Sequence, residues 1–530
     1  MRKPNAAFIF LLIAFLLAAC KQSDDSVTLV EVEGGRVEGV VEDGITVFRG
    51  IPFAAPPVGE LRWCPPQPVV PWDTVLLADA FAPACPQMRM SYPGAPEMKV
   101  SEDCLYLNIW TLAESSKNRL PVMVWIHGGG FAMGSTSVPA YSGEELAKMG
   151  VIVVSIAYRV GALGFLAHPE LTAESDHHVS GNYGLLDQIA GLEWVQRNIG
   201  SFGGDPERVT IFGESAGGIS VSMLCASPLC KGLFARTISQ SGGNFGPVSL
   251  ERKGDGIQLL EGAERTGEEF AARMGARSIT ELREVDPQQW MSDPLSRMGG
   301  FWPVLDGYVI TGDQYLLYKE GNYNDVDVII GTNSDEGSMF VRPSEPAQYE
   351  KNIRQRFGPF ANRILELYPG NTERETYTSS ADIFREIAFA WPSWTWARLQ
   401  SRTGDSRVFV YYFDQQQPAS PFSPYKPRGA SHGAEIGYVF RHLPRGDDSP
   451  YTGEDLELSE MMARYWTNFA KTGDPNGEGL PRWPVFEEGE HSVLYIRGTP
   501  HTGPVPNMEK LRLMEEYFSW LRDKGSETNH

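Results

Sequence analysis

The sequence is poor in positive charge for its length. Its 530 residues carry 46 lysines and arginines against 67 aspartates and glutamates, which gives a formal net charge of −21. The basic residues form no stripe, whereas proteins that bind nucleic acid need a basic surface to neutralise phosphates. We therefore expect no nucleic-acid partner and attribute the acidity to solubility.

The sequence also has little that could cross a membrane. Its N-terminal apolar run, residues 6–19, falls short of the about 20 residues that a membrane-spanning helix needs. Arg2 and Lys3 precede this run and small residues end it, so we interpret residues 1–19 as a signal peptide. No repeat or low-complexity linker divides the remainder. We expect one large domain at residues 27–524 and a polar tail at 525–530.

A cysteine follows the small residues directly, and this arrangement resembles the lipobox of bacterial lipoproteins. The resemblance implies that Cys20 is lipidated and is the first mature residue, with residues 20–26 as a polar tether. It further implies a lipid-anchored protein of the bacterial cell envelope, on the outer membrane or at the periplasmic face. Lys21, in place of aspartate, favours the outer membrane. A secreted precursor that happens to carry Cys20 is the alternative.

Cysteine is scarce, with six in the chain, and none forms the C-x-x-C pairs of a zinc site. Cys85 and Cys104 flank a loop that is poor in order of its own, and a disulfide between them would constrain it. Cys225 and Cys230 could close a second, shorter loop. Cys64 would then remain free.

Strand and helix patterns alternate along most of the chain. Apolar runs predict strands that are covered on both faces, at residues 122–127, 151–158, 208–212, 237–239, 326–330 and 408–413. Helical patterns occupy residues 187–199, 456–470 and 508–521. This alternation predicts an α/β fold with a mostly parallel, doubly wound sheet. Helix-rich stretches at 249–323 and 344–398 are expected to insert above the sheet and wall a substrate pocket.

The most informative segment is GESAG at residues 213–217, between a predicted strand and an apolar helix. A G-x-S-x-G in that context is typical of a nucleophile elbow, whose sharp turn exposes the serine hydroxyl. The turn is so tight that the residues two before and two after Ser215 must lack a Cβ. We predict Ser215 as a nucleophile; a tight turn with a capping serine is the alternative.

A serine nucleophile needs a base, and the base needs an orienting acid, which in this fold precedes the histidine in the chain. Of nine histidines, His432 lies in a frame of small residues, GASHGA at 429–434, that would let a loop bring its imidazole close to the serine. The acid should follow a strand, where Asp335 and Glu336 stand together. Composition cannot choose between these two carboxylates.

An HGGG motif at residues 127–130 follows a predicted strand. Glycines allow backbone N–H groups to converge on one point, and together with the Ala216 N–H they would form an oxyanion hole. A flexible glycine turn is the alternative.

In this order, the motifs resemble those of the type-B carboxylesterase family of α/β-hydrolases, which includes cholinesterases and bacterial p-nitrobenzyl-esterase-like enzymes. The resemblance runs from about residue 27 to the C-terminal helix and includes FRGIPFA at 48–54, PPVG at 56–59, SEDCLYLN at 101–108, GNYGL at 181–185 and FGGDP at 202–206. It implies the α/β-hydrolase fold, with a mostly parallel central sheet, helices on both faces and large helical insertions.

The resemblance also implies roles for single residues. The acid would be Glu336, the base His432, the oxyanion donors Gly129, Gly130 and Ala216, the serine beside the triad Ser241, and the disulfide Cys85–Cys104. The pair Cys225–Cys230 gains no such support. Cholinesterases place a tryptophan in the early disulfide loop to hold a quaternary ammonium. This chain has only Tyr92 there, so choline esters are not expected as preferred substrates.

The sequence therefore predicts a serine carboxylesterase that hydrolyses a small-molecule ester through an acyl-enzyme, without a metal or cofactor. A lipase, or a specialised polyester, toxin or feruloyl esterase, is the alternative within enzymes. A non-catalytic adhesion or binding protein is the alternative from another class. Such proteins typically lack one residue of the triad, whereas all three are present here.

Overall fold

The computed structural model describes residues 27–88, 98–250, 256–416, 418, 428–446, 449–487, 489 and 492–528. The predicted signal peptide, Cys20 and the polar tether lie outside the described residues, and so does Tyr92. The predicted lipid anchor therefore stays a prediction.

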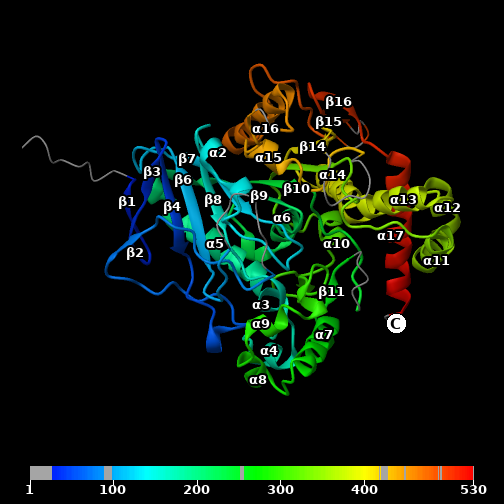
Figure 1. The fold of residues 1–530 in the computed structure, drawn as a ribbon, viewed down its shortest axis with the longest axis horizontal. Helices are drawn as coiled ribbons and strands as arrows, with labels where there is room; N and C mark the ends of the chain where they lie inside the picture. Colours follow the sequence, from blue (N-terminus) through cyan, green and yellow to red (C-terminus); the bar gives the residue numbers. More distant parts are fainter. Residues whose placement is uncertain are drawn as a thin grey trace, which may run out of the picture.

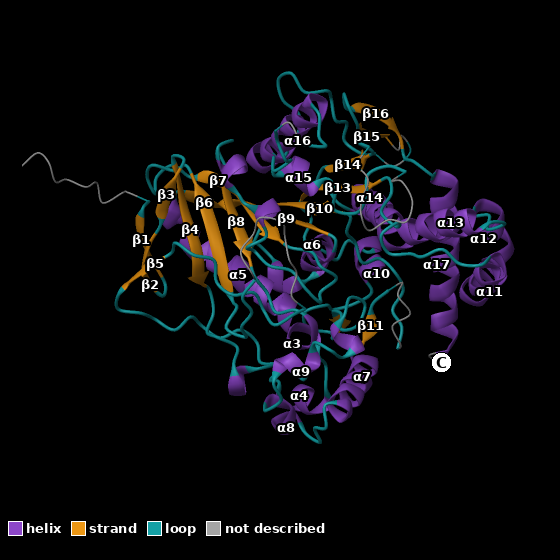
Figure 2. Ribbon diagram, in the orientation of Figure 1, coloured by secondary structure: helices purple, strands orange, loops and turns teal. Residues whose placement is uncertain are grey.

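One large sheet runs through the centre of the molecule, as Figures 1 and 2 show. Its strands in chain order are β3 (Val40–Glu42), β4 (Ile45–Pro52), β6 (Tyr106–Thr111), β7 (Leu120–Ile126), β8 (Ile152–Ile156), β9 (Gly204–Glu214), β10 (Arg236–Gln240), β13 (Asp327–Asn333), β14 (Val408–Phe413), β15 (Ser492–Ile496) and β16 (His501–Pro504). Across the sheet the order is β16-β15-β14-β13-β10-β9-β7-β8-β6-β4-β3. Strands from β8 to β15 pair in parallel, and antiparallel strands complete both edges. The predicted α/β class with a mostly parallel sheet is confirmed.

Two smaller sheets flank the central one. The first contains β1 (Leu29–Val32), β2 (Gly35–Glu38) and β5 (Val75–Leu77), and the second contains β11 (Gln258–Leu259) and β12 (Val304–Leu305). The helices are α2 (Glu144–Ala147), α3 (Gly161–Phe165), α4 (Pro169–Glu174), α5 (Tyr183–Asn198), α6 (Ala216–Ala226), α7 (Leu260–Arg273), α8 (Ile279–Arg283), α9 (Pro287–Trp290), α10 (Gln314–Lys319), α11 (Pro346–Phe357), α12 (Ala361–Leu367), α13 (Glu373–Arg385), α14 (Trp391–Thr403), α15 (Ile436–Val439), α16 (Gly453–Thr472) and α17 (Met508–Thr528). A short π-helix, η7 (Glu386–Ala390), joins α13 to α14.

Both faces of the central sheet are buried, as the apolar runs predict. Along β7, Val122, Val124 and Ile126 belong to one hydrophobic cluster, which includes residues of α5 and α6. The alternate residues Met123 and Trp125 belong to a second cluster, which includes residues of α15 and α16. Since successive side chains of a strand point to opposite faces, this division places helices on both sides of the sheet.

The helix-rich insertions occupy the predicted positions. Helices α7–α9 project from one end of the molecule, and α11–α13 lie at another edge beside α17 (Figure 1). Both insertions contribute side chains to a single large pocket over the sheet, among them Trp302 from the first and Phe389 from the second. Helix α17 begins at the predicted Met508 but continues to Thr528, past the predicted end at residue 521. Within the described ranges, no helix combines the length and the apolar character that crossing a bilayer requires.

The cysteines follow the predicted pattern. Cys85 and Cys104 form a disulfide with an S–S distance of 2.05 Å. Cys225 and Cys230 are both buried free thiols, so the second disulfide, which the sequence left open, is not formed here. Cys64 is also a free thiol.

Candidate active site

Ser215 lies at a sharp turn between the end of β9 and the start of α6. Its φ of 55° is in the left-handed region that residues other than glycine rarely adopt. A Cβ on Gly213 would lie 2.6 Å from the Gly217 carbonyl carbon, and a Cβ on Gly217 would lie 2.0 Å from the Ile126 oxygen. The turn therefore needs glycine at both positions, which is the requirement that the elbow motif predicts.

Glu336 and His432 are in direct contact. Glu336 Oε2 lies 2.6 Å from His432 Nδ1, and Glu336 is fully buried. The other carboxylate oxygen, Oε1, accepts hydrogen bonds from Ser241 Oγ at 2.6 Å and from the Asn333 N–H at 2.7 Å. Three partners therefore fix the orientation of this carboxylate.

The neighbouring Asp335, which composition could not separate from Glu336, is turned away from the imidazole. Its carboxylate accepts a hydrogen bond from the Ser338 hydroxyl and lies 3.4 Å from the Arg428 guanidinium. A bridge between Asp335 and Ser431 joins the acid loop to the histidine loop. Asp335 therefore ties the two loops together, and Glu336 contacts the histidine.

The fold brings the three predicted residues to the same edge of the sheet. Ser215 follows β9 and Glu336 follows β13, two parallel strands separated only by β10. His432 lies in the loop between β14 and α15. Because the carboxyl ends of parallel strands meet at one edge, residues distant in the chain converge there.

His432 Nε2 faces Glu214, the residue before the serine. Nε2 lies 3.2 Å from Glu214 Oε1, and among the described residues no hydrogen bond joins Nε2 to Ser215 Oγ. Apart from this contact, the buried Glu214 Oε1 has no hydrogen-bond partner within the same residues. Our sequence reasoning missed Glu214, although a carboxylate inside the GESAG motif was the available signal.

Three buried carboxylates surround His432, those of Glu214, Glu336 and Glu435. Burial raises the pKa of Glu214, and the charges of Glu435 and Glu336 raise it further against the opposing effect of His432. Burial lowers the pKa of His432, but the carboxylates outweigh burial and the net shift is upward. Glu214 raises the pKa of His432 only while the Glu214 carboxylate is ionised. The two side chains therefore compete for one proton. The pKa of His432 stays above its ordinary value, because Glu336 contacts Nδ1 whatever the state of Glu214.

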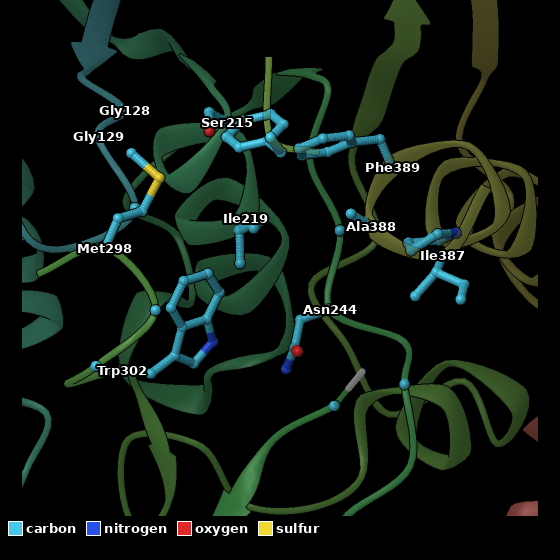
Figure 3. Close-up of a pocket in the computed structure, with 18 of the residues that line it drawn as sticks. Gly128, Gly129, Ser215, Ile219, Asn244, Met298, Trp302, Ile387, Ala388 and Phe389 are labelled. Carbon is cyan, nitrogen blue, oxygen red and sulfur yellow. The ribbon is translucent and has the colours of Figure 1, made fainter. Parts of the chain in front are cut away.

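Two aromatic rings hold the imidazole from the pocket side. Phe389 stacks on His432 with ring centroids 4.5 Å apart, and Phe340 meets it edge-on at 5.2 Å. Phe389 comes from η7, and Figure 3 shows Ile387, Ala388 and Phe389 along the pocket wall. Such π-turns are frequent at functional sites. No feature of the sequence marked this one in advance.

The predicted oxyanion glycines lie beside Ser215, in the loop that follows β7. Gly129 and Gly130 have φ values of 110° and 61°, and neither N–H donates to another described residue. The Ala216 N–H is the first of α6, where a helix leaves its donors unpaired. A Cβ on Gly128 would lie 3.1 Å from the Ser215 Cβ, which shows how closely the two loops approach. The structure therefore places the predicted glycine loop beside Ser215 and the first residue of α6.

His127 packs against this glycine loop. It is buried, its Nδ1 lies 2.9 Å from the Gly128 oxygen, and its ring stacks on Tyr158 with centroids 4.4 Å apart. Burial lowers the pKa of His127 to about 4, so it stays neutral at neutral pH. This histidine is a packing element of the loop.

Ser215 and His432 open into a cavity of about 980 Å³. Near the serine its walls are mostly apolar, as Figure 3 shows for Ile219, Met298 and Trp302. Polar and charged residues that also line it are Tyr141, Glu214, Asn244, Gln258, Arg265, Thr266, Glu269 and Arg356. Within the described ranges, no cluster of histidine, cysteine, aspartate and glutamate side chains is arranged to hold a metal ion.

Known proteins are similar to this chain in both sequence and architecture. The profile of the carboxylesterase family matches residues 26–515. Fumonisin B1 esterase of Sphingopyxis macrogoltabida is 36% identical over 507 residues, which cover 91% of this chain and 88% of that protein. Para-nitrobenzyl esterase of Bacillus subtilis (strain 168) is 34% identical over 482 residues, 88% of this chain and 94% of that one. A solved structure of a PNB esterase superposes with a TM-score of 0.77 at 33% identity, covering 92% of this chain and all of that one.

Proposed function

The chain belongs to the carboxylesterase family and is a carboxylic ester hydrolase, and we propose that Ser215, His432 and Glu336 perform the hydrolysis through an acyl-enzyme. The contact of 2.6 Å between Glu336 Oε2 and His432 Nδ1, beside a serine on a strained elbow, carries this proposal. A serine hydroxyl is a poor nucleophile alone, and a histidine oriented by a carboxylate activates it.

In the first half-reaction, Ser215 Oγ attacks the ester carbonyl carbon and its proton passes to His432 Nε2. Nε2 turns from Glu214 toward the adjacent serine to accept it. Glu336 keeps the Nδ1–H pointed at itself and stabilises the imidazolium. The N–H groups of Gly129, Gly130 and Ala216 donate to the oxyanion, and one such donor is typically worth about 10²–10³ in rate.

The first tetrahedral intermediate then collapses, the bond to the alcohol oxygen breaks as the imidazolium gives that oxygen its proton, and the alcohol leaves; this completes the first half-reaction and leaves the acyl-enzyme. The second half-reaction hydrolyses the acyl-enzyme. Water then enters, His432 removes its proton, and the resulting hydroxide attacks the acyl carbonyl carbon. The second tetrahedral intermediate collapses, the bond to Ser215 Oγ breaks, and Oγ takes the proton back from His432. The products are the carboxylic acid and the free serine, and the protein's own residues supply every group used.

Two other functions receive less support. A non-catalytic adhesion protein has no need of a paired histidine and carboxylate beside a strained serine, and all of these residues are present here. The relatives are named for fumonisin B1 and for para-nitrobenzyl esters, two different esters, so family membership alone leaves the substrate open. The choice between a general esterase and a specialised one depends on the pocket.

A direct test uses residues 20–530 without lipid. This protein should hydrolyse p-nitrophenyl acetate or butyrate, and Ser215→Ala should abolish turnover, whereas Ser292→Ala, at an exposed position, should keep it. Full activity of Ser215→Ala would refute the mechanism.

The proposal for the N-terminus is independent of the chemistry. Residues 1–19 would be removed, Cys20 would carry the lipid, residues 20–26 would be the tether, and residues 27–524 would form the catalytic domain at the cell envelope. More than one acyl chain is needed for stable anchoring, because a single chain binds membranes marginally. Mass spectrometry of membrane fractions tests this, and an unmodified residue 20 would contradict it.

A further inference from the structure

Asn333, the last residue of β13, contacts the acid with its main chain and the histidine loop with its side chain. It is fully buried, and its backbone N–H donates to Glu336 Oε1 at 2.7 Å. Its side-chain Nδ2 donates to the Ser431 oxygen at 2.8 Å and to Glu435 Oε2 at 2.5 Å. One asparagine therefore joins the acid to the loop that carries the base.

The two acceptors of this amide lie on either side of the base in the chain. Ser431 directly precedes His432, and Glu435 follows it, immediately before α15. An amide nitrogen has two hydrogens to donate, and both are used here. The amide oxygen Oδ1 is buried and has no hydrogen-bond partner among the described residues. The amide is therefore held by its two donations, one on each side of the histidine.

Glu435 is a fully buried carboxylate that depends on amide donors. Besides Asn333, Gln240 donates to it, from Nε2 to Oε1 at 3.2 Å. Burial and the charge of Glu336 raise the pKa of Glu435, and the hydrogen bonds from the two amides oppose that rise. A buried carboxylate is costly unless its oxygens are hydrogen-bonded. Moving Glu435 away from β13 would remove a donor, so the contact with Asn333 restrains the loop.

The other contacts between the two loops end before the base. Residues 334 and 335 contact residues 428–431 through hydrogen bonds and a bridge, and all of these precede His432 in the chain. Within the part of the chain that the structure describes, Asn333 is the residue of segment 333–335 that also reaches Glu435, beyond the base. Its amide therefore restrains the loop on both sides of the imidazole.

We propose that Asn333 is a positioning residue, which holds His432 with Nδ1 at Glu336 and Nε2 beside Ser215. This inference rests on the proposed esterase function and adds one residue to its machinery. Asn333 does not line the cavity, so it acts on the reaction only through the histidine loop. A displaced base lowers the rate of the chemical step, because that step needs the reacting groups in near-attack geometry. Substrate binding does not need this geometry, so kcat should fall and KM should not rise.

The test replaces Asn333 with leucine, which is similar in size but has no donor. Hydrolysis of p-nitrophenyl butyrate gives kcat and KM, with the enzyme concentration taken from titration of Ser215 by a fluorophosphonate. We expect kcat to fall about tenfold, the loss typical of one hydrogen bond to a charged group, with KM little changed. Asn333→Ala removes the same donors with a smaller side chain, and it serves if Asn333→Leu does not fold.

A second background separates positioning from stability. His432→Ala should keep a residual activity that comes from the oxyanion hole and substrate binding. Asn333→Leu made in that background should cost no further activity, because the base through which it acts is already absent.

Asn198→Leu is the matched control. Asn198 is buried at the end of α5 and outside the cavity, and its amide bonds the Trp194 oxygen at 2.9 Å and the Glu33 N–H at 3.0 Å. The replacement should lower stability and leave kcat unchanged. An unchanged kcat in both Asn333 variants, a rise in KM alone, or an equal loss in the His432→Ala background would overturn the inference. A wild type that hydrolyses no ester would instead overturn the proposed function.

Discussion

Ser241 Oγ donates a hydrogen bond of 2.6 Å to Glu336 Oε1, while the other oxygen of that carboxylate contacts His432. Ser241 itself has a φ of 50° and is fully buried, directly after β10. The serine therefore restrains the carboxylate from the side opposite the imidazole. It acts on catalysis only through Glu336, which makes it a positioning residue.

Replacing Ser241 with alanine should lower kcat by about tenfold with little change in KM, because one hydrogen bond to a charged group is lost. The measurement is steady-state hydrolysis of p-nitrophenyl butyrate. The same replacement made in Glu336→Gln should cost much less, because the neutral amide no longer forms a charged pair. Equal losses in both backgrounds would show that Ser241 acts on stability and not through Glu336.

The carboxylates around His432 predict the pH dependence of the reaction. His432 must be neutral to accept the serine proton, and its pKa lies above the usual 6.5. Activity should therefore rise with pH through that raised pKa. Glu214→Gln removes the carboxylate that faces Nε2, which lowers the pKa of His432 and moves the acid limb of the kcat/KM profile to lower pH. Glu366→Gln, at an exposed site on α12, should leave the limb in place; an unmoved limb in Glu214→Gln would contradict the assignment.

The tight turn at Ser215 predicts that replacing glycine with alanine destabilises the protein at one position and not at another. Gly217→Ala would place a Cβ 2.0 Å from the Ile126 oxygen, so it should lower the free energy of unfolding by about 1–3 kcal/mol or more and reduce kcat. Gly200→Ala, where nothing lies within 4 Å of the new Cβ, should stay within about 0.5 kcal/mol of the wild type. Denaturant unfolding measures both, and equal stabilities would show that the turn tolerates a side chain.

The disulfide is expected to stabilise the folded state by restricting the unfolded chain between its two cysteines. Cys85 and Cys104 are 19 residues apart, and replacing both with serine should cost about 3 kcal/mol in the chain-entropy account. Unfolding with and without a reducing agent measures this cost, with Cys64→Ser as the control. Equal stability of the wild type and the double serine variant would show that the bridge adds nothing.

Much of this architecture follows from the sequence, because buried parallel strands are apolar along their whole length. The run at residues 122–127 overlaps β7, which begins two residues earlier and ends at Ile126, and the run at 151–158 contains the shorter β8, Ile152–Ile156. The short strands at the sheet edges, such as β3 and β16, have no such run and were not predicted. Strand β9 starts earlier than its apolar core, at Gly204, since pairing between Leu120 and Gly204 extends it.

The residues of the site likewise divide into those that the sequence could identify and those that it could not. Ser215 and the oxyanion glycines were identifiable because a tight turn restricts which residues can flank it. Composition could not separate Asp335 from Glu336, because only the path of the loop decides which carboxylate faces His432. Phe389 was missed for the same reason, since its role depends on its stacking against His432 in the folded protein.

During turnover, an acyl group should be transferred to Ser215. Acid quenching of the enzyme while it hydrolyses p-nitrophenyl butyrate, followed by peptide mass spectrometry, tests this directly. We expect a butyryl mass on the peptide that contains Ser215, and neither that mass nor turnover in Ser215→Ala. A butyryl group found only on another residue, with turnover preserved in Ser215→Ala, would contradict it.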